Sequence, residues 1–307
     1  MQANKRDFLS LLDFTPAELD LLIARGMHMR TLHAAGELYQ PLVGKTGALV
    51  LTMNSTRTRV AFEAGLAQLG GHCVALSSTD SQLGRGEPIE DLARVLSEMV
   101  DIVMVRTADQ AAIDTLAAYA SIPVINAMSS LLHPCQLLAD VQTFVELRGS
   151  IRGKTVTFLG DGYNMCHSYI NASRQWDFDL RIACPDTHQP DADILAQAPR
   201  AQRVLDPKAA VEGSHLVVTD VWSSMGHEGQ EADRIATFTP YRVDEALLDL
   251  AAPEVLFMHC LPAHRGEEVS ATLLDDPRAV VWQEAGNRLH SQKALMEWLL
   301  LGPPANA

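Results

Sequence analysis

The chain has 307 residues, of which 47% are hydrophobic and 20% are charged, and its formal net charge at pH 7 is −14. This length favours two domains, and the composition is that of a globular protein able to bury a sizeable core. The acidic balance excludes a basic stripe that would meet a phosphate backbone, so we expect no nucleic-acid partner.

Strand-length apolar runs alternate with helix-length segments along the first half of the chain, a pattern typical of α/β folds with parallel sheets. The expected strands cover residues 48–52, 72–76, 102–106 and 124–126. The expected helices between them cover residues 60–69, 89–99 and 111–119. A further helix opens at His133 and is expected to run to about Leu147.

A second series of elements follows a polar, glycine-bearing joint at residues 148–154. The expected strands are 155–159, 180–183, 216–220, 255–258 and 279–282, and a closing helix runs from Gly286 to Leu301. We expect an α/β fold with two domains, each a parallel sheet flanked by helices. Their bounds are 1–132 and 133–285, with the C-terminal segment 286–307 packing back on the first domain. Ligands of such sheets bind beyond the carboxyl ends of the strands, which we expect to face one cleft.

The cysteines and the N-terminus bear on location. The five cysteines show no CxxC spacing, which suits a reducing compartment and gives no support to a disulfide framework or a zinc site. No apolar run has the length that spans a bilayer, and the first residues lack the layout of a signal or transit peptide. We therefore expect a cytoplasmic protein without a membrane partner.

The segment from Ser55 to Arg59, with the sequence STRTR, lies between an expected strand and an expected helix. A helix N-terminus offers unpaired N–H groups and partial positive charge, and hydroxyl and guanidinium groups match phosphate oxygens. Two arginines within three residues are not a by-product of composition in so acidic a chain. The segment therefore indicates a phosphate site, with a plain helix N-cap and solvated arginines as the alternative.

Two further candidates follow strands of the first half. Arg106 closes the strand that begins at Ile102, where an ordinary surface arginine is the simpler interpretation. His133 and Gln136 open a helix three residues apart, so both can be aimed at one ligand. Neutral His133 can donate a hydrogen bond to a carbonyl group, whereas a helix start with Pro134 in its first turn is the alternative.

Three loops of the second half carry candidates as well. The run from Gly160 to Met165 lacks the third glycine of a dinucleotide fingerprint, so we exclude NAD binding. Its polar residues Asp161 and Asn164 either face a ligand or only stabilise a turn. Asp220 ends a strand and supplies the carboxylate that a cationic amino group needs, with a helix N-cap as the alternative. His259 and Cys260 are adjacent and point to opposite faces of a strand, so they are not a nucleophilic pair.

Together these motifs resemble the aspartate/ornithine carbamoyltransferase family, and within it the ornithine carbamoyltransferases. The resemblance runs nearly end to end, because five motifs occur in order at strand ends. They are Ser55 to Arg59, Gln82 to Glu87, His133 to Gln136, Asp220 with Ser224-Met225-Gly226, and His259 to Pro262. The resemblance implies transfer of the carbamoyl group of carbamoyl phosphate to the δ-amine of L-ornithine, giving L-citrulline and phosphate. It also implies a homotrimer with active sites between subunits and no metal or other cofactor.

The same resemblance implies a role for each matched residue. Carbamoyl phosphate would be bound by Ser55, Thr56, Arg57, Thr58, Arg106, His133, Gln136, Cys260, Leu261 and Arg288, together with Gln82 of a neighbouring subunit. Ornithine would be bound by Asn164, Asp220, Ser224 and Met225, with its δ-amine beside Cys260 and the Leu261 carbonyl. The catalytic residues would be Arg57, Arg106, His133 and Cys260.

Two residues depart from the family pattern. Tyr163 stands where a second asparagine is common, and Asp244 stands where asparagine is usual. Ser224-Met225-Gly226 favours an α-amino acid over putrescine, and residues 84–86 lack the lysine of the aspartate enzymes. Transfer to another amine, putrescine or a modified ornithine, stays open because Tyr163 adds bulk. A catalytically silent member that binds phosphate ligands is an alternative of a different class, against which the complete residue set argues.

Overall fold

The computed structural model describes residues 5–77, 86–223 and 231–303. Contacts divide the chain into two compact units: unit 1 is Met1–Gln142 with Gly286–Ala307, and unit 2 is Thr143–Ala285. The expected boundary between residues 132 and 133 lies just before helix α5 (Pro134–Arg148), whereas the division falls inside this helix. The early residues of α5 belong to unit 1 because they bond to it, as Cys135 Sγ does to the Asn126 carbonyl at 3.4 Å.

Unit 1 is built on a parallel sheet of four strands in the order β2-β1-β3-β4. The strands are β1 (Thr46–Leu51), β2 (His72–Ser77), β3 (Ile102–Arg106) and β4 (Val124–Met128). Strands β1 and β3 are buried almost throughout, as continuous apolar runs predict. Leu51 lies opposite Arg106 in the register, so the segment after β1 begins beside the end of β3.

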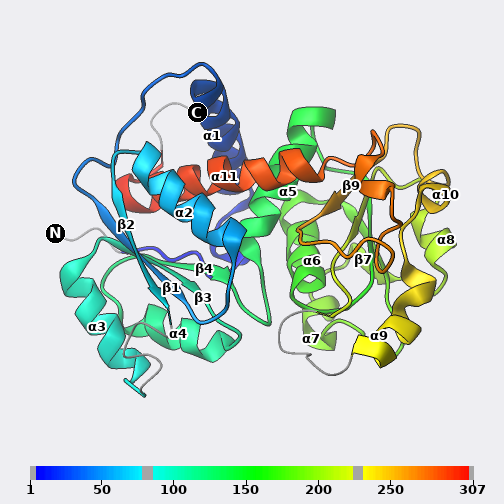
Figure 1. The fold of residues 1–307 in the computed structure, drawn as a ribbon, viewed down its shortest axis with the longest axis horizontal. Coiled ribbons are helices and arrows are strands. Elements are labelled where there is room, and N and C mark those ends of the chain that lie inside the picture. The colour runs from blue at the N-terminus through cyan, green and yellow to red at the C-terminus, as the bar shows by residue number, and fades with distance from the viewer. Residues whose placement is uncertain (1–4, 78–85, 224–230, 304–307) are drawn as a thin grey trace. The chain divides into compact units, whose positions relative to one another are not determined.

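Helices cover both faces of this sheet (Figure 1). Helices α1 (Pro16–Ala34), α2 (Thr56–Gln68) and the unit 1 part of α11 (Val281–Leu301) lie on one face, and α3 (Ile89–Met99) and α4 (Gln110–Tyr119) lie on the other. On the α3–α4 face, Val50 and Val105 pack against Leu92 and Ile113. Helices on both faces therefore hold β1 and β3 in place, and the carboxyl ends of these strands remain available for a ligand site.

Unit 2 holds a parallel sheet of five strands in the order β7-β6-β5-β8-β9. The strands are β5 (Thr155–Leu159), β6 (Asp179–Ala183), β7 (Ala201–Arg203), β8 (Leu216–Thr219) and β9 (Leu256–His259). In the register Leu159 lies opposite Thr219, and Thr219 lies opposite His259. The segments after β5, β8 and β9 therefore start side by side.

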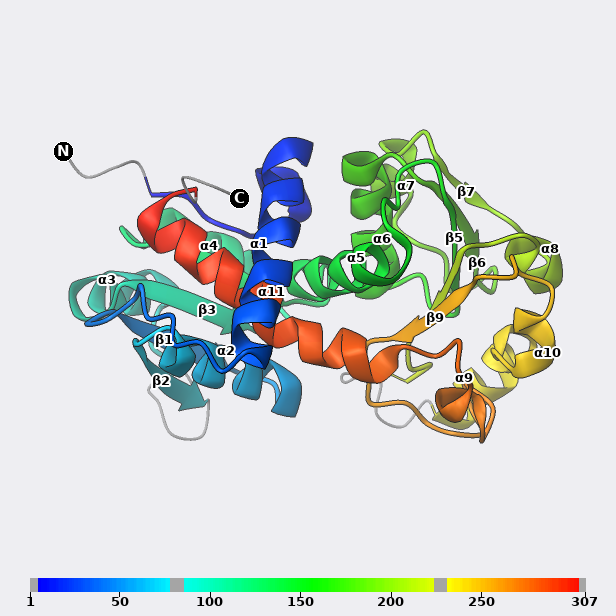
Figure 2. The ribbon, with the colours of Figure 1, turned by 90° about the horizontal axis from the view of Figure 1, so that it is seen from above.

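The helices of unit 2 also form two layers (Figure 2). Helices α6 (Asn164–Trp176) and α7 (Ala192–Ala196) lie on one face of the sheet, and α8 (Pro207–Val211) and α10 (Glu245–Leu248) lie on the other. Leu159, Val217 and Phe257 form the core with residues of α8 and α10. Helix α9 (Glu231–Phe238) and 3-10 turns at Leu11–Asp13, Thr239–Tyr241 and Leu273–Asp275 complete the described elements. No helix within the described ranges is long and apolar enough to cross a membrane.

The expected fold class, two parallel sheets flanked by helices, is confirmed, but several of the expected elements need correction. The strand expected at 279–282 is wrong: Ala279 forms only an isolated bridge with Phe257, and the apolar run continues into α11 from Val281. Strand β7 was missed because its residues are polar and mostly exposed. Helix α2 begins at Thr56 rather than at residue 60.

Candidate functional site

The STRTR segment forms the first turn of α2 in unit 1. Ser55 is the N-cap residue, and its Oγ accepts a hydrogen bond from the Thr58 N–H at 3.2 Å. The N-cap interpretation is therefore right, but it leaves the phosphate interpretation intact. The N–H groups of Thr56 and Arg57 belong to the first turn, where no carbonyl of the helix can accept from them. The turn can therefore bind an anion with backbone donors and positive helix-dipole charge.

The two arginines of the segment have different surroundings. Arg59 is exposed and forms an ion pair with Glu63, one turn along α2, at 3.0 Å. Arg57 is half-buried on the same turn as Thr58. Only Arg57 therefore remains a candidate for the site.

Arg106, at the end of β3, is buried and not a surface residue as its position alone suggested. Its Nη1 donates a hydrogen bond to the Thr58 Oγ1 at 3.3 Å, and Thr58 is itself buried. The register that sets the end of β1 beside the end of β3 explains why these two residues meet.

His133 lies buried just before α5, among positive charges. Burial lowers the pKa of its imidazole well below the usual value, and the charges of Arg288, Arg106 and Arg57 lower it further. The imidazole is therefore neutral at physiological pH. A neutral imidazole still carries one N–H and can donate a hydrogen bond to a carbonyl oxygen while adding no charge.

Gln136 and Arg288 are held in one orientation by a buried chain of hydrogen bonds. Gln136 Nε2 donates to Asp140 Oδ1 at 2.9 Å, and Gln136 Oε1 accepts from Arg288 Nη1 at 2.6 Å. Arg288 Nε donates to Gln292 Oε1 at 2.7 Å. Because Asp140 takes the amide N–H of Gln136, the amide oxygen is the end turned toward Arg288. Asp140 thus sets which end of Gln136 a bound molecule meets.

Unit 1 therefore gathers three arginines around a neutral histidine at the carboxyl ends of its strands. In a chain of net charge −14, such a largely buried positive cluster is a strong attractor for a small multivalent anion. Gln82, the remaining residue expected here, lies outside the described residues.

In unit 2 the loop after β5 brings Asn164 to the start of α6. Gly160 has a φ of +119°, and a Cβ on Gly162 would lie 2.2 Å from the backbone nitrogen of Pro190. Both glycines therefore serve a tight turn, as their position suggested. Asp161 forms a buried ion pair with Arg234, so its carboxylate has a structural role. Asn164 is buried at the first position of α6 and remains the candidate of this loop.

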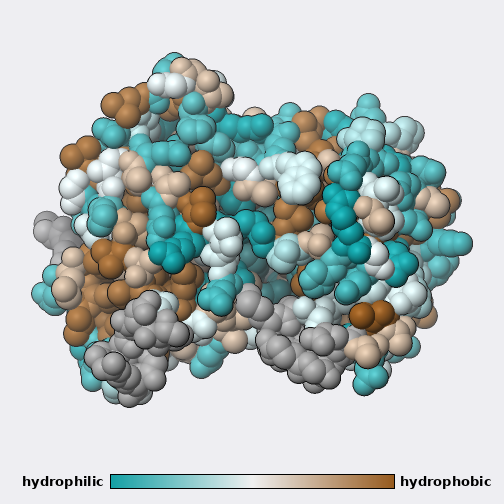
Figure 3. Space-filling model, in the orientation of Figure 1, coloured by the Kyte–Doolittle hydropathy of each residue, from teal (hydrophilic) through white to brown (hydrophobic). Residues whose placement is uncertain are grey.

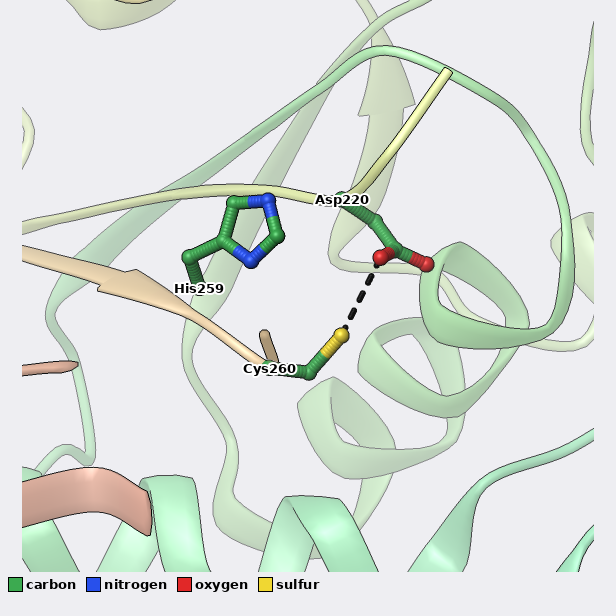
Figure 4. A group of neighbouring side chains, drawn as sticks. All are labelled: Asp220, His259 and Cys260. Carbon is green, nitrogen blue, oxygen red and sulfur yellow. Dashed lines mark hydrogen bonds between the residues drawn. The ribbon is translucent and has the colours of Figure 1, made fainter. Parts of the chain in front are cut away.

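Asp220 follows β8 and meets Cys260, which follows the neighbouring strand β9 (Figure 4). The Cys260 thiol donates a hydrogen bond to Asp220 Oδ1 at 3.1 Å, and the Val221 N–H donates to the same oxygen at 2.8 Å. Burial raises the pKa of the Asp220 carboxyl above its usual value, although the nearby His259 and the Cys260 hydrogen bond oppose this shift. The second carboxylate oxygen is left to bind a cationic or neutral amine.

His259, fully buried at the end of β9, fixes the turn that follows it. Its Nδ1 accepts from the Leu261 N–H at 2.8 Å, so the ring proton sits on Nε2, which donates to Glu268 Oε1 at 3.2 Å. Leu261 adopts a φ of +57°, a conformation rare for leucine. This turn presents the Leu261 carbonyl and the Cys260 thiol from one short segment.

The ligand atoms of Asp220, His259 and Cys260 lie within 4.8 Å of one another, a grouping that can hold a metal ion. Both ring nitrogens of His259 are already engaged by Leu261 and Glu268, however. A metal ion would have to break one of these bonds, so the arrangement favours a positioning role for His259 over metal ligation.

The remaining residues expected in unit 2 are placed only in part. Ser224 and Met225 lie outside the described residues. Asp244 is the N-cap of α10 and accepts from the Leu247 N–H at 2.8 Å, a role that asparagine serves equally well. Tyr163 is the residue that precedes α6 and is half-buried.

Sequence reasoning missed four buried polar residues that hold the candidates in place: Asp140, Gln292, Glu268 and Glu284. Two of them carried a detectable signal, because Asp140 and Gln292 stand four residues after Gln136 and Arg288 on the same helices. Glu268 and Glu284 carried none, since they stand 9 and 25 residues after His259, at no helical or strand spacing from it.

Comparisons with known proteins match this chain over almost its whole length. Residues 6–146 match the carbamoyl-P binding domain of aspartate/ornithine carbamoyltransferase, and residues 152–299 match the Asp/Orn binding domain of the same family. An ornithine carbamoyltransferase of Chromohalobacter salexigens is 58% identical, covering 97% of this chain and 98% of its own. An anabolic ornithine carbamoyltransferase of Pseudomonas aeruginosa is 57% identical, covering 96% and 97%.

Solved structures of similar proteins share the fold. Ornithine carbamoyltransferase of Burkholderia thailandensis superposes with a TM-score of 0.91 at 46% identity, covering 97% of this chain and 100% of its own. That of Pyrococcus furiosus superposes with a TM-score of 0.92 at 41% identity, covering 97% and 98%.

Proposed function

This chain belongs to the aspartate/ornithine carbamoyltransferase family, and we propose that it transfers the carbamoyl group of carbamoyl phosphate to the δ-amine of L-ornithine. The products are L-citrulline and phosphate. The observation that carries the proposal is the cluster of buried Arg106 and Arg288 and half-buried Arg57 around neutral His133. Such a cluster fits a small dianionic acyl phosphate, which carries a polar carbonyl group beside its phosphate.

We assign carbamoyl phosphate to unit 1. Ser55, Thr56, Arg57 and Thr58 bind its phosphate with hydroxyl groups, first-turn N–H groups and a guanidinium. Arg106 and His133 donate to the carbonyl oxygen. Gln136 Oε1, turned by Asp140, accepts from the carbamoyl NH₂ beside Arg288. This last contact distinguishes a carbamoyl group from an acetyl group, which has no N–H to donate.

We assign ornithine to unit 2. Asn164 and Asp220, together with Ser224 and Met225 of the 224–226 segment, hold its α-amino and carboxylate groups. Cys260 and the Leu261 carbonyl lie at the δ-amine. Free ornithine is mostly protonated there at neutral pH, since an alkyl ammonium resembles lysine, with a pKa of about 10.4. The partly buried Asp220–Cys260 pair offers an environment that selects the neutral amine.

The reaction then needs no covalent enzyme intermediate. The lone pair of the neutral δ-amine attacks the carbamoyl carbon, and the carbonyl oxygen gains negative charge beside Arg106 and neutral His133. The bond from the carbamoyl carbon to the bridging oxygen breaks, and phosphate leaves with the proton that the amine gives up. Donors aimed at such developing charge are each worth ~10²–10³ in rate.

We further propose a cytoplasmic homotrimer. Strand β2 is an edge strand that pairs only with β1 among the described strands, and Val74 on it is 41% exposed. Figure 3 shows hydrophobic residues gathered over this part of unit 1. Open strand edges and exposed apolar side chains are features that an oligomer interface covers. All five cysteines are thiols, which suits a reducing compartment.

Replacement of Arg57 by alanine tests the proposal. We expect Arg57→Ala to lose nearly all turnover, because the phosphate and the charge that develops on it lose a guanidinium, while the oligomer stays intact. Citrulline formation and the mass in solution are the two measurements. Arg59→Ala is the matched control, since Arg59 faces Glu63, and it should retain activity. Turnover of Arg57→Ala at the wild-type rate would remove the proposal.

A further inference from the structure

A cavity of unit 1 is lined by none of the candidate site residues. It has a volume of about 480 Å³ and is bounded by the end of α1, the segment after it, the end of α2 and one residue of α11. Its walls include apolar Met29, Leu32 and Ala67. Its polar members are buried Lys293, half-buried Tyr39 and Gln68, and exposed His33, Glu37 and Gln40. A volume of this size accommodates a molecule as large as an amino acid.

Lys293 is the unusual member of the lining. It is only 6% exposed, and its Nζ has one hydrogen-bond acceptor in the described chain, the neutral amide oxygen of Gln68 at 3.1 Å. An ammonium group has three N–H donors, so two remain available. Lysine is rarely buried without a partner of opposite charge. Burial accordingly lowers the pKa of Lys293, and the charge of Glu297 only partly opposes that effect.

Glu297, the carboxylate whose charge acts on Lys293, is already used by other residues. Both oxygens of Glu297 accept from Arg25, at 2.7 and 2.9 Å, and the Tyr39 hydroxyl donates to one of them. Arg25 and Glu297 are both buried. Two buried cations therefore share one buried anion, and the uncompensated positive charge lies on Lys293 at the cavity wall.

We propose that this cavity binds a small aliphatic carboxylate of amino-acid size, held by Lys293 and Gln68. Gln68 Oε1 is taken by Lys293, so its Nε2 is the free end, and Nζ and Nε2 together offer donors for two carboxylate oxygens. The aliphatic part packs against Met29, Leu32 and Ala67. A phosphate needs more donors than these two, and it gains little from an apolar wall.

The inference does not depend on the proposed function, because none of these residues belongs to the carbamoyl phosphate or ornithine assignments. The test is titration calorimetry of the whole protein with sodium valerate, 1-pentanol and inorganic phosphate. We expect valerate to bind and 1-pentanol not to bind. Because phosphate is a product of the proposed reaction and can bind at the STRTR segment, its test is competition, and we expect phosphate not to displace valerate. Saturating carbamoyl phosphate should leave the valerate affinity unchanged.

Two variants locate the binding. Lys293→Gln should lower valerate affinity by at least about tenfold, because a charge-assisted hydrogen bond is lost. Ala67→Phe fills the cavity from an exposed position, keeps Lys293 and should abolish valerate binding. Lys208→Gln, an exposed lysine of unit 2, is the control and should bind as wild type does. Absence of valerate binding, equal binding by Ala67→Phe, or displacement of valerate by phosphate would overturn the inference.

Discussion

At the scale of the residue, the neighbours of His133 determine the protonation state of its imidazole. Charged imidazole would repel the three arginines, whereas the neutral ring donates a hydrogen bond without adding to the positive charge. A neutral donor also loses no activity as pH changes around neutrality. The acid limb of any pH–rate profile should therefore belong to a different group.

The lowered pKa of His133 predicts a pH dependence of stability. The unfolded chain binds a proton at this residue below about pH 6.5, and the folded chain does not. The free energy of unfolding should therefore fall as pH drops below that value, by up to about 1.4 kcal/mol per pH unit from this group. His133→Asn should show a weaker fall between pH 6.5 and 5.5 in urea unfolding. An imidazole titration of His133 near pH 6.5, seen by NMR of the folded protein, would contradict this account.

Asp220 is a residue whose proposed role in binding ornithine costs stability. Burial raises its pKa, so holding it ionised at neutral pH is unfavourable, and this cost is present above its folded pKa. We expect Asp220→Asn to be as stable as wild type or more stable, while ornithine no longer saturates and carbamoyl phosphate still binds. Asp161→Asn is the control: it leaves buried Arg234 unpaired and should destabilise by about 3–5 kcal/mol. Loss of carbamoyl phosphate binding in Asp220→Asn would show that the residue is assigned wrongly.

At the scale of the element, the start of α2 combines a helix cap with a proposed phosphate site. Ser55 serves both roles. Its Oγ accepts a hydrogen bond from the Thr58 N–H as the helix cap, and its hydroxyl proton can be donated to an anion. The two roles can be separated, since aspartate caps a helix as well as serine does but repels phosphate.

Ser55→Asp should therefore keep the melting temperature of the wild type and lose carbamoyl phosphate binding. Ser55→Ala should lose about 1 kcal/mol of stability with the cap and bind carbamoyl phosphate more weakly than wild type. Thermal unfolding and calorimetric titration measure the two effects. Full carbamoyl phosphate affinity in Ser55→Asp would place the phosphate away from this turn.

Elements were predictable where sequence pattern and burial coincide. Strands β3 and β5 and helix α3 have the predicted bounds, because each strand is an apolar run and the helix shows apolar residues at helical spacing. Strand β7 is short and polar, so only its pairing with β6 defines it. The run at residues 279–282 was misleading, because an apolar segment of four residues fits the start of a helix as well as a strand.

The candidate site was predictable to a similar degree. Residues at strand ends could be proposed because parallel strands end at one edge of the sheet. Their supports could not, since the contacts from Glu268 and Glu284 to His259 depend on the tertiary fold. The unpaired charge of Lys293 is likewise visible only once Glu297 is seen to be occupied by Arg25 and Tyr39.

At the scale of the whole molecule, the proposed trimer predicts that a charged substitution on edge strand β2 prevents assembly. Val74→Glu on β2 should reduce the mass measured by light scattering from about three times 33.5 kDa to that of one chain, because a charge cannot be buried there unpaired. Leu205→Glu alters a residue of unit 2 that is 71% exposed and should leave the mass unchanged. A wild-type protein that is already a single chain would remove the trimer proposal.

The most direct test of the central claim is citrulline formation from carbamoyl phosphate, with ornithine, putrescine, aspartate and N-acetylornithine compared under identical conditions. Carbamoyl transfer to each of the other amines is followed in parallel by its own product. Strong preference for ornithine is the predicted result, because Asp220 and the 224–226 segment are assigned to its α-amino and carboxylate groups. Preference for another amine would contradict the ornithine assignment in unit 2, and absence of turnover with all four would contradict carbamoyl transfer itself.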